Sequence, residues 1–150
     1  LAQLERVEDF VKRKREIASQ YNLLLKDQKK LKLPSDPPYD GKNSFWLYTI
    51  IVKDLSKGEL AKIIETLSMQ GVESRPIFYP FHLQPIYRNY RIPDMDYSRS
   101  EYLSQCGLSL PSSTLIKTNE IERVCELLIK ALDNLMLEDL SVCQNLLQGS

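Results

Sequence analysis

The feature that most limits the fold is a long amphipathic helix at the start of the chain. Apolar side chains follow the i, i+3, i+4 spacing of one helical face over residues 1–27, with charged side chains elsewhere. The members of this stripe are Leu1, Leu4, Val7, Val11, Ile17, Ala18, Tyr21 and Leu25. A helix this long cannot bury its stripe alone. We therefore expect it to pack on the sheet of this domain and on something further upstream.

Residues 44–52 form the strongest predicted strand, because they are dense in aromatic and β-branched side chains. One face would carry Phe45, Leu47, Thr49 and Ile51, and the other Trp46, Tyr48, Ile50 and Val52. Both faces are apolar enough to be covered, one of them by helices. The face with Trp46 and Tyr48 is then either a binding or domain-contact surface, or one side of a strand buried between two helical layers.

The remaining elements have local start and stop signals. Residues 29–42 are predicted as an exposed loop, and Ser56 and Glu59 match a capping box for a helix that Gly71 ends. Residues 72–77 and 107–111 suit short strands, residues 97–105 a short helix, and Thr118 can cap a last helix. The buried stripe of this helix would be Ile121, Val124, Cys125, Leu128, Leu132 and Leu135. We predict an α+β fold, a small antiparallel sheet of about three strands packed with helices.

Composition narrows the class of protein. The chain has 150 residues, 43% of them hydrophobic, with 20 basic and 20 acidic side chains, which fits one globular domain. Zero net charge gives no general attraction to nucleic acid. The basic run at residues 12–15 is read as a solvated helix face paired with Glu8 and Asp9, four residues before Lys12 and Arg13. No apolar run is long enough to span a membrane.

The cysteines and the histidine limit the chemistry. Cys106, Cys125 and Cys143 are odd in number and lack metal-ligand spacing, so we interpret them as buried thiols of a reducing compartment, the cytoplasm. A single histidine, His82, excludes a zinc site built on several histidines, and we predict no metal site. The chain starts without Met inside a helical pattern, so we expect Leu1 to be an interior point of a longer protein.

The segment Gly71–Tyr87 is the strongest candidate for a functional loop. It contains Arg75, the only histidine, two tyrosines, Gln84 and three prolines, which rule out a helix or a central strand there. An ordered loop with so many hydrogen-bonding and aromatic groups is typical of a binding site. The alternative is a proline-stiffened connection that covers the core with its own aromatics. For each candidate residue the sequence leaves a structural role open.

Several motifs, taken in order, resemble one enzyme family. They are the helix start Leu1–Arg6, followed by basic residues and Tyr21, the aromatic strand Phe45–Tyr48, the segments Gly71–Pro76 and His82–Tyr87, and Leu108–Pro111 before a closing helix. Over about residues 1–135 this order resembles the C-terminal part of the DegT/DnrJ/EryC1/StrS family, the aminotransferases of nucleotide-sugar biosynthesis that depend on pyridoxal phosphate (PLP). The resemblance implies a fold-type I enzyme, a homodimer that moves an amino group, usually from glutamate, to a keto nucleotide-sugar.

The resemblance also divides the chain and assigns roles. Residues 1–27 would lead in from a missing N-terminal PLP domain, 28–137 would form the small C-terminal domain, and 138–150 a helical extension or tail. The aldimine lysine would lie upstream, so the 150 residues alone would bind no cofactor and hold no catalytic residue. The expected substrate-binding residues are Arg75, Tyr79, His82, Gln84, Tyr87 and Trp46. A non-catalytic ligand-binding or dimerisation module is the alternative function.

Overall fold

The computed structural model describes residues 4–56 and 58–148, with side chains described up to residue 135. Short 3₁₀ helices are labelled η. The elements are η1 (Leu4–Arg6), α1 (Val7–Leu25), β1 (Leu31–Lys32), β2 (Tyr48–Val52), α2 (Glu59–Met69), β3 (Arg75–Pro76), η2 (Phe81–Leu83), η3 (Pro85–Tyr90), α3 (Ser98–Cys106), β4 (Gly107–Leu110) and α4 (Thr118–Gln148). The predicted α+β class is confirmed, and α4 runs without interruption past residue 137.

The sheet is antiparallel and has four strands in the order β1-β2-β4-β3. This is one strand more than the three expected. The additional strand, β1, lies inside the segment predicted as an exposed loop, where Leu31 pairs with Val52 and is only 6% exposed. Two residues carry no periodicity, so local sequence gave no signal for this strand. Its pairing depends on the neighbouring strand β2.

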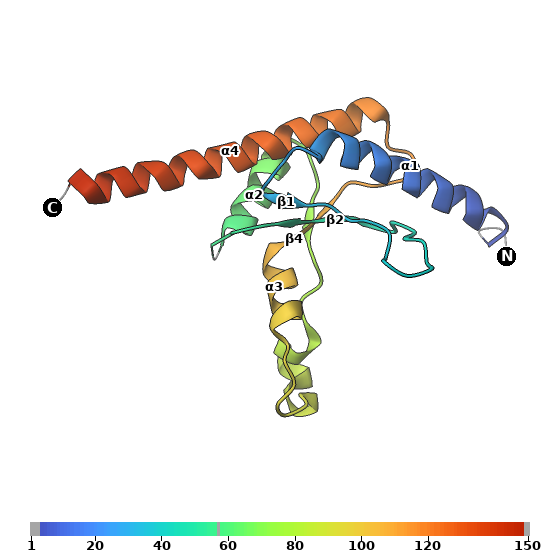
Figure 1. Cartoon of the computed structure of the whole chain (residues 1–150), viewed down its shortest axis with the longest axis horizontal. Coiled ribbons are helices and arrows are strands. Elements are labelled where there is room, and N and C mark those ends of the chain that lie inside the picture. The colour runs from blue at the N-terminus through green and yellow to red at the C-terminus, as the bar shows by residue number, and fades with distance from the viewer. Residues whose placement is uncertain (1–3, 57, 149–150) are drawn as a thin grey trace.

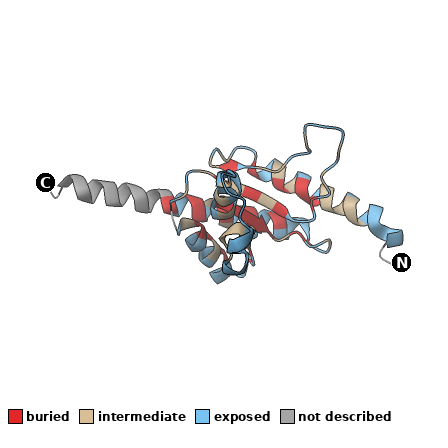
Figure 2. Cartoon of the chain, turned by 90° about the horizontal axis from the view of Figure 1, so that it is seen from below, coloured by how far each residue is buried: buried red, intermediate tan, exposed pale blue. Residues whose placement is uncertain are grey.

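One face of the sheet is covered by helices. In Figure 1, α1 and α4 lie along one side of the strands, and α2 packs against α4. The side chains of Tyr48, Ile50 and Val52 point into this layer and are fully buried. Figure 2 shows the buried residues gathered between the helices and the sheet. The face of Tyr48 is therefore the core face.

This arrangement corrects the predicted role of the strand's two faces. Trp46 does not share the environment of Tyr48: it precedes β2 and is 68% exposed, while Tyr48 is in the core. The reason is a turn at Phe45, whose φ of 49° interrupts the alternation of an extended strand before β2 begins. Phe45 itself is buried, so it does not follow the predicted pattern either.

The two long helices differ in how much of their stripe they bury. In α4, all six predicted stripe residues up to Leu135 are buried. In α1 only the second half is buried, because Val7 is 45% exposed and Leu4 in η1 is 70% exposed. The expectation that this domain covers only part of the first helix is confirmed for the residues described, and Leu1 lies outside them.

The basic run in α1 attaches loops to the helix. Arg13 donates to the carbonyl oxygens of Thr114 and Ile116, and Lys14 donates to those of Trp46 and Ser112. Arg15 forms a bidentate pair with Asp36, at 2.7 and 2.8 Å. The acidic partner of Arg13 is thus Glu16, in place of the predicted Asp9. The acidic partner of Arg15 is Asp36. Burial lowers the pKa of Lys14.

Between β3 and β4 the chain makes a long excursion, residues 77–106, which we call the arm. In Figure 1 it projects from the sheet on the side away from α1 and α4. It contains η2, η3 and α3, and it returns to the sheet at Gly107. A Cβ atom at Gly107 would lie 2.6 Å from the carbonyl oxygen of Leu103, so the return requires glycine.

Gly71, the capping box and the cysteines were each singled out from the sequence, and the structure shows how they are placed. Gly71 has a φ of 75° and ends α2 as predicted. Of the capping box, the structure shows the half in which the Glu59 carboxylate accepts from the Ser56 backbone N–H, at 2.6 Å. Cys106 and Cys125 are buried free thiols, and the side chain of Cys143 lies outside those described. None of the helices within the described ranges combines the length and apolarity needed to cross a membrane.

Candidate functional site

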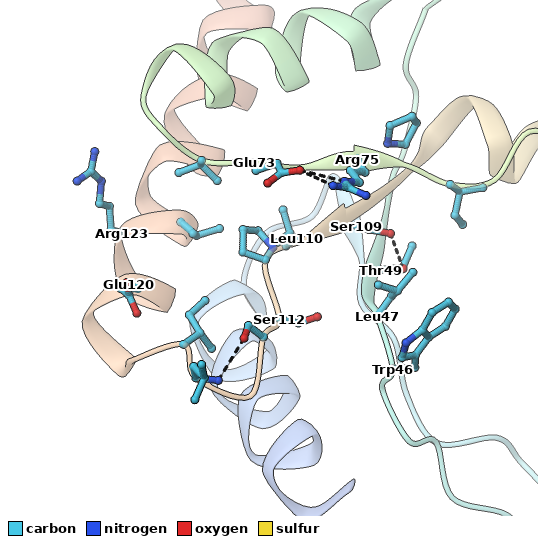
Figure 3. Close-up of a pocket in the computed structure, with 18 of the residues that line it drawn as sticks. Trp46, Leu47, Thr49, Glu73, Arg75, Ser109, Leu110, Ser112, Glu120 and Arg123 are labelled. Carbon is cyan, nitrogen blue, oxygen red and sulfur yellow. Dashed lines mark hydrogen bonds and ion pairs between the residues drawn. The ribbon is translucent and has the colours of Figure 1, made fainter. Parts of the chain in front are cut away.

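A groove of about 1330 Å³ lies at one end of the sheet. Its walls come from the residues before β2, the edge strand β3, the end of β4 and the first turns of α4. Figure 3 shows Trp46 and Leu47 on one side, Arg75 and Glu73 above, and Glu120 and Arg123 opposite. We call this hollow the sheet groove. It brings together two of the predicted substrate-binding residues, Trp46 and Arg75.

The sheet groove contains a pair of hydroxyl groups that the sequence did not single out. Thr49 and Ser109 are direct partners in the β2–β4 register, and their hydroxyl oxygens lie 2.9 Å apart. A hydroxyl both donates and accepts, so each has hydrogen-bonding capacity left after the mutual bond. Ser109 lies in the Leu108–Pro111 segment, but neither hydroxyl was singled out as a site residue from the sequence. Only the strand register places them together.

Arg75 is the cationic group on the β3 side of the sheet groove. Its guanidinium pairs with the Glu73 carboxylate two residues earlier, with Nε 3.1 Å from Oε1, and this pairing raises the pKa of Arg75. Both side chains are 76% exposed, so the ion pair adds little to stability. The guanidinium therefore remains accessible to an anionic ligand that displaces Glu73.

A second, smaller hollow of about 420 Å³ lies on the arm. It is lined mostly by aromatic rings, and two predicted site residues, His82 and Tyr87, belong to it. Tyr87 contacts Phe81 edge-to-face, with ring centroids 5.2 Å apart. We call it the arm pocket. The two hollows share no lining residue, so Trp46 and Arg75 lie in one of them and His82 and Tyr87 in the other.

His82 has defined partners inside the arm. Its side chain is 7% exposed, its Nε2 lies 2.8 Å from Oε1 of Glu101, and its ring stacks on Tyr97 at a centroid distance of 4.1 Å. These contacts are of the kind that the structural alternative for His82 requires. Glu101 and Tyr97 were not singled out from the sequence, because they lie nineteen and fifteen residues further along the chain.

The last two predicted residues lie on the outside of the arm. Tyr79 is 60% exposed. The side-chain amide of Gln84 donates to the backbone carbonyl of Tyr79 at 3.2 Å, which closes a local turn. Neither residue lines either of the two hollows. The assignment of all six residues to substrate binding stays a prediction.

Within the described residues, neither of the two hollows provides an anchor for PLP. A Schiff-base lysine needs a hydrophobic or positively charged pocket that lowers its pKa, and the lining residues of the sheet groove and of the arm pocket include no lysine. Lys14 has a lowered pKa but donates to two backbone carbonyls.

Comparison with known proteins identifies the class. Residues 1–129 match the model of the DegT/DnrJ/EryC1/StrS aminotransferase family, and the chain belongs to this family. It is 31% identical over 130 residues to the GDP-perosamine synthase of Escherichia coli O157:H7, covering 84% of this chain and 32% of the relative. It is 29% identical over 136 residues to the GDP-perosamine synthase of Caulobacter vibrioides, covering 91% of this chain and 35% of the relative.

A solved structure shows the same fold. The putative sugar aminotransferase Spr1654 from Streptococcus pneumoniae, in its apo form, superposes with a TM-score of 0.82 at 20% identity. The match covers 93% of this chain and 35% of that one. The chain thus spans about a third of the length of the relatives it matches. Membership in the family and the fold follow from these matches.

Proposed function

We propose that this chain is the substrate-side, C-terminal part of a PLP-dependent aminotransferase that moves an amino group from glutamate to a keto group of a nucleotide-linked sugar. Family membership supports the reaction class, and relatives named GDP-perosamine synthase support a sugar nucleotide as substrate. PLP and its lysine would come from an N-terminal domain, and the full protein would act as a cytoplasmic homodimer. Residues 1–27 would connect to that domain, 28–137 would form the small domain, and 138–150 would extend it.

The observation that carries this proposal is the composition of the sheet groove. A nucleotide sugar presents anionic phosphates, several hydroxyls and a flat base. The groove offers a guanidinium at Arg75, the hydroxyls of Thr49 and Ser109, and the exposed ring of Trp46. Arg75 lies in β3, directly before the arm, and we include the arm residues Tyr79 and Tyr87 among the proposed substrate contacts.

The test is Arg75→Ala in the full-length protein, with Arg99→Ala as the matched control. Arg99 is an exposed arginine on α3 that lines neither hollow. Removing a charge-assisted contact should weaken GDP-perosamine binding by roughly ten- to a hundredfold, as measured by calorimetry. The control should bind as wild type, and cofactor absorbance should be unchanged in both. Wild-type binding by Arg75→Ala would contradict the proposal.

A second test concerns the cofactor. The 150-residue chain should form no borohydride-trappable Schiff base at one specific lysine when mixed with PLP, because no lysine lines the sheet groove or the arm pocket. Mass spectrometry of the reduced, digested chain checks this. A single lysine modified in high yield would place an anchor in this chain and contradict the assignment of PLP to another domain.

A further inference from the structure

The arm has few internal supports for its length. Between Ile77 and Tyr97 it contains two short 3₁₀ helices and no paired strand, and many of its large apolar side chains are exposed. The exposed ones include Phe78, Phe81, Ile86, Tyr90, Ile92 and Met95. Burial of apolar side chains therefore contributes little to the shape of this segment. Specific polar and ring contacts must therefore hold residues 77–97 against α3.

The side chain of His82 contrasts with these exposed apolar side chains. It is 7% exposed and lies between two groups of the return segment, the Glu101 carboxylate at 2.8 Å and the stacked ring of Tyr97. Glu101 is in the first turn of α3, and its side chain is 35% exposed. One hydrogen bond and one ring contact thus join η2 to the start of α3.

Tyr97 extends this connection to the far end of the arm. Its hydroxyl oxygen accepts the backbone N–H of Ile92 at 3.1 Å, and the Arg91 guanidinium lies 5.4 Å from its ring centroid. The arm pocket is built on the same residues, since His82, Tyr97, Tyr87 and Tyr90 all line it. Three separate turns of the arm therefore meet at the His82–Tyr97 stack.

We propose that Glu101 is a positioning residue that fixes the arm through His82, with Tyr97 as the supporting ring. This inference rests on the proposed function, in which the arm contacts the sugar nucleotide. It assigns His82 to holding the arm in shape, so that the contacts to substrate come from its neighbours. Pre-ordering a loop in this way lowers the entropy lost when ligand binds.

The kinetic test uses Glu101→Ala and Glu101→Gln in the full-length protein, with Glu122→Gln on the exposed side of α4 as control. Glu101→Ala removes the acceptor for His82 and should raise KM for the keto nucleotide-sugar about tenfold while leaving KM for glutamate unchanged. Glu101→Gln keeps a side-chain oxygen that accepts from the imidazole N–H, so it should restore most of the loss. The control should behave as wild type.

A double-mutant cycle separates positioning from direct contact. If Glu101 acts through His82, the pair Glu101→Ala, His82→Ala should lose no more than His82→Ala alone. Additive losses would show that His82 acts independently of Glu101 and would overturn the inference. Should Glu101→Ala fail to fold, Tyr97→Phe removes only the hydroxyl bond to Ile92. It should raise the same KM by about two- to threefold, and no change in this variant would also overturn the inference.

Limited proteolysis tests the arm independently of catalysis. Trypsin should cut the Glu101→Ala variant at the exposed Arg88 and Arg91 about tenfold faster than wild type, because cleavage follows the open population of the arm. Faster cleavage with unchanged kinetics would support the role of Glu101 in fixing the arm but contradict the proposed role of the arm in substrate binding. Unchanged cleavage would overturn the inference itself.

Discussion

The helix-backed side of the sheet and the arm use similar side chains in opposite ways. In the core, Tyr21 and Tyr48 are fully buried, stack at 4.5 Å, and donate their hydroxyls to Pro111 O and Asn22 Oδ1 at 2.7 Å. Burial raises the pKa of both hydroxyls. In the arm, Tyr79 and Tyr90 are 60% and 79% exposed. The same residue type is a structural group in one region and an accessible surface group in the other.

The core and the arm differ in the interactions that hold their shape. The core is held by apolar area removed from water, over many residues of β2, α1, α2 and α4. The arm is held by a few specific contacts centred on His82, Tyr97 and Glu101. We therefore expect the core to respond to changes in side-chain volume, and the arm to respond to the loss of single hydrogen bonds.

The largest expected effect comes from truncating one apolar side chain in each region. Leu128→Ala removes a fully buried side chain of α4 and should lower the free energy of unfolding by roughly 2–5 kcal/mol. Ile86→Ala, at a residue 77% exposed in the arm, should change it by less than about 0.5 kcal/mol. Urea unfolding of the 150-residue chain measures both. Equal losses would contradict the contrast between core and arm.

Thiol labelling compares the core with the foot of the arm. Burial raises the pKa of Cys125 to about 12 and also raises that of Cys106, which ends α3. In a Cys143→Ser background at pH 8, native Cys125 should react with iodoacetamide roughly a hundredfold more slowly than in the unfolded chain, and Cys106 should react sooner than Cys125. Folding raises the pKa of both thiols. Their contribution to the free energy of unfolding is therefore fully present below about pH 8.5 and is lost as the pH rises above that value.

A smaller effect is expected at the junction between α2 and the strand that leads into the arm. Gly71 has a φ of 75°, and a Cβ there would meet nothing within 4 Å, so the cost of Gly71→Ala is a backbone cost alone. It should lower the free energy of unfolding by about 1–2 kcal/mol. Gln70→Ala, one residue earlier with a φ of −94°, is the control and should be nearly neutral. An unchanged free energy of unfolding in Gly71→Ala would contradict a backbone cost at this position.

The smallest effect concerns a loop attached to α1. The paired guanidinium of Arg15 and the backbone N–H of Asn43 hold the pKa of Asp36 well below its usual range. Because the folded pKa is lowered, the associated stability is present above about pH 4 and is lost as pH falls through the folded value. Asp36→Asn should flatten the acid limb of the stability profile, measured by thermal melts between about pH 2 and 5. Asp40→Asn in the same loop should keep the wild-type slope.

Much of the fold was predictable from the sequence, and the site was predictable only in part. The stripe of α4 and the strand at residues 107–110 carry strong local signals, and both are confirmed. The short strand β1 and the orientation of Trp46 were not predictable, since they depend on pairing with β2 and on the turn at Phe45. The Thr49–Ser109 hydroxyl pair is a product of strand register, because its members lie sixty positions apart in the sequence.

The sequence by itself determined the class of protein, the helices and main strands, and the presence of a proline-stiffened segment rich in polar and aromatic groups. These features depend on residue type and short-range spacing, which the chain carries in any conformation. The tertiary structure decided which residues of that segment meet. It placed Arg75 with Trp46 in the sheet groove and closed His82 against Glu101, because long-range pairing and packing, not local pattern, bring distant residues together.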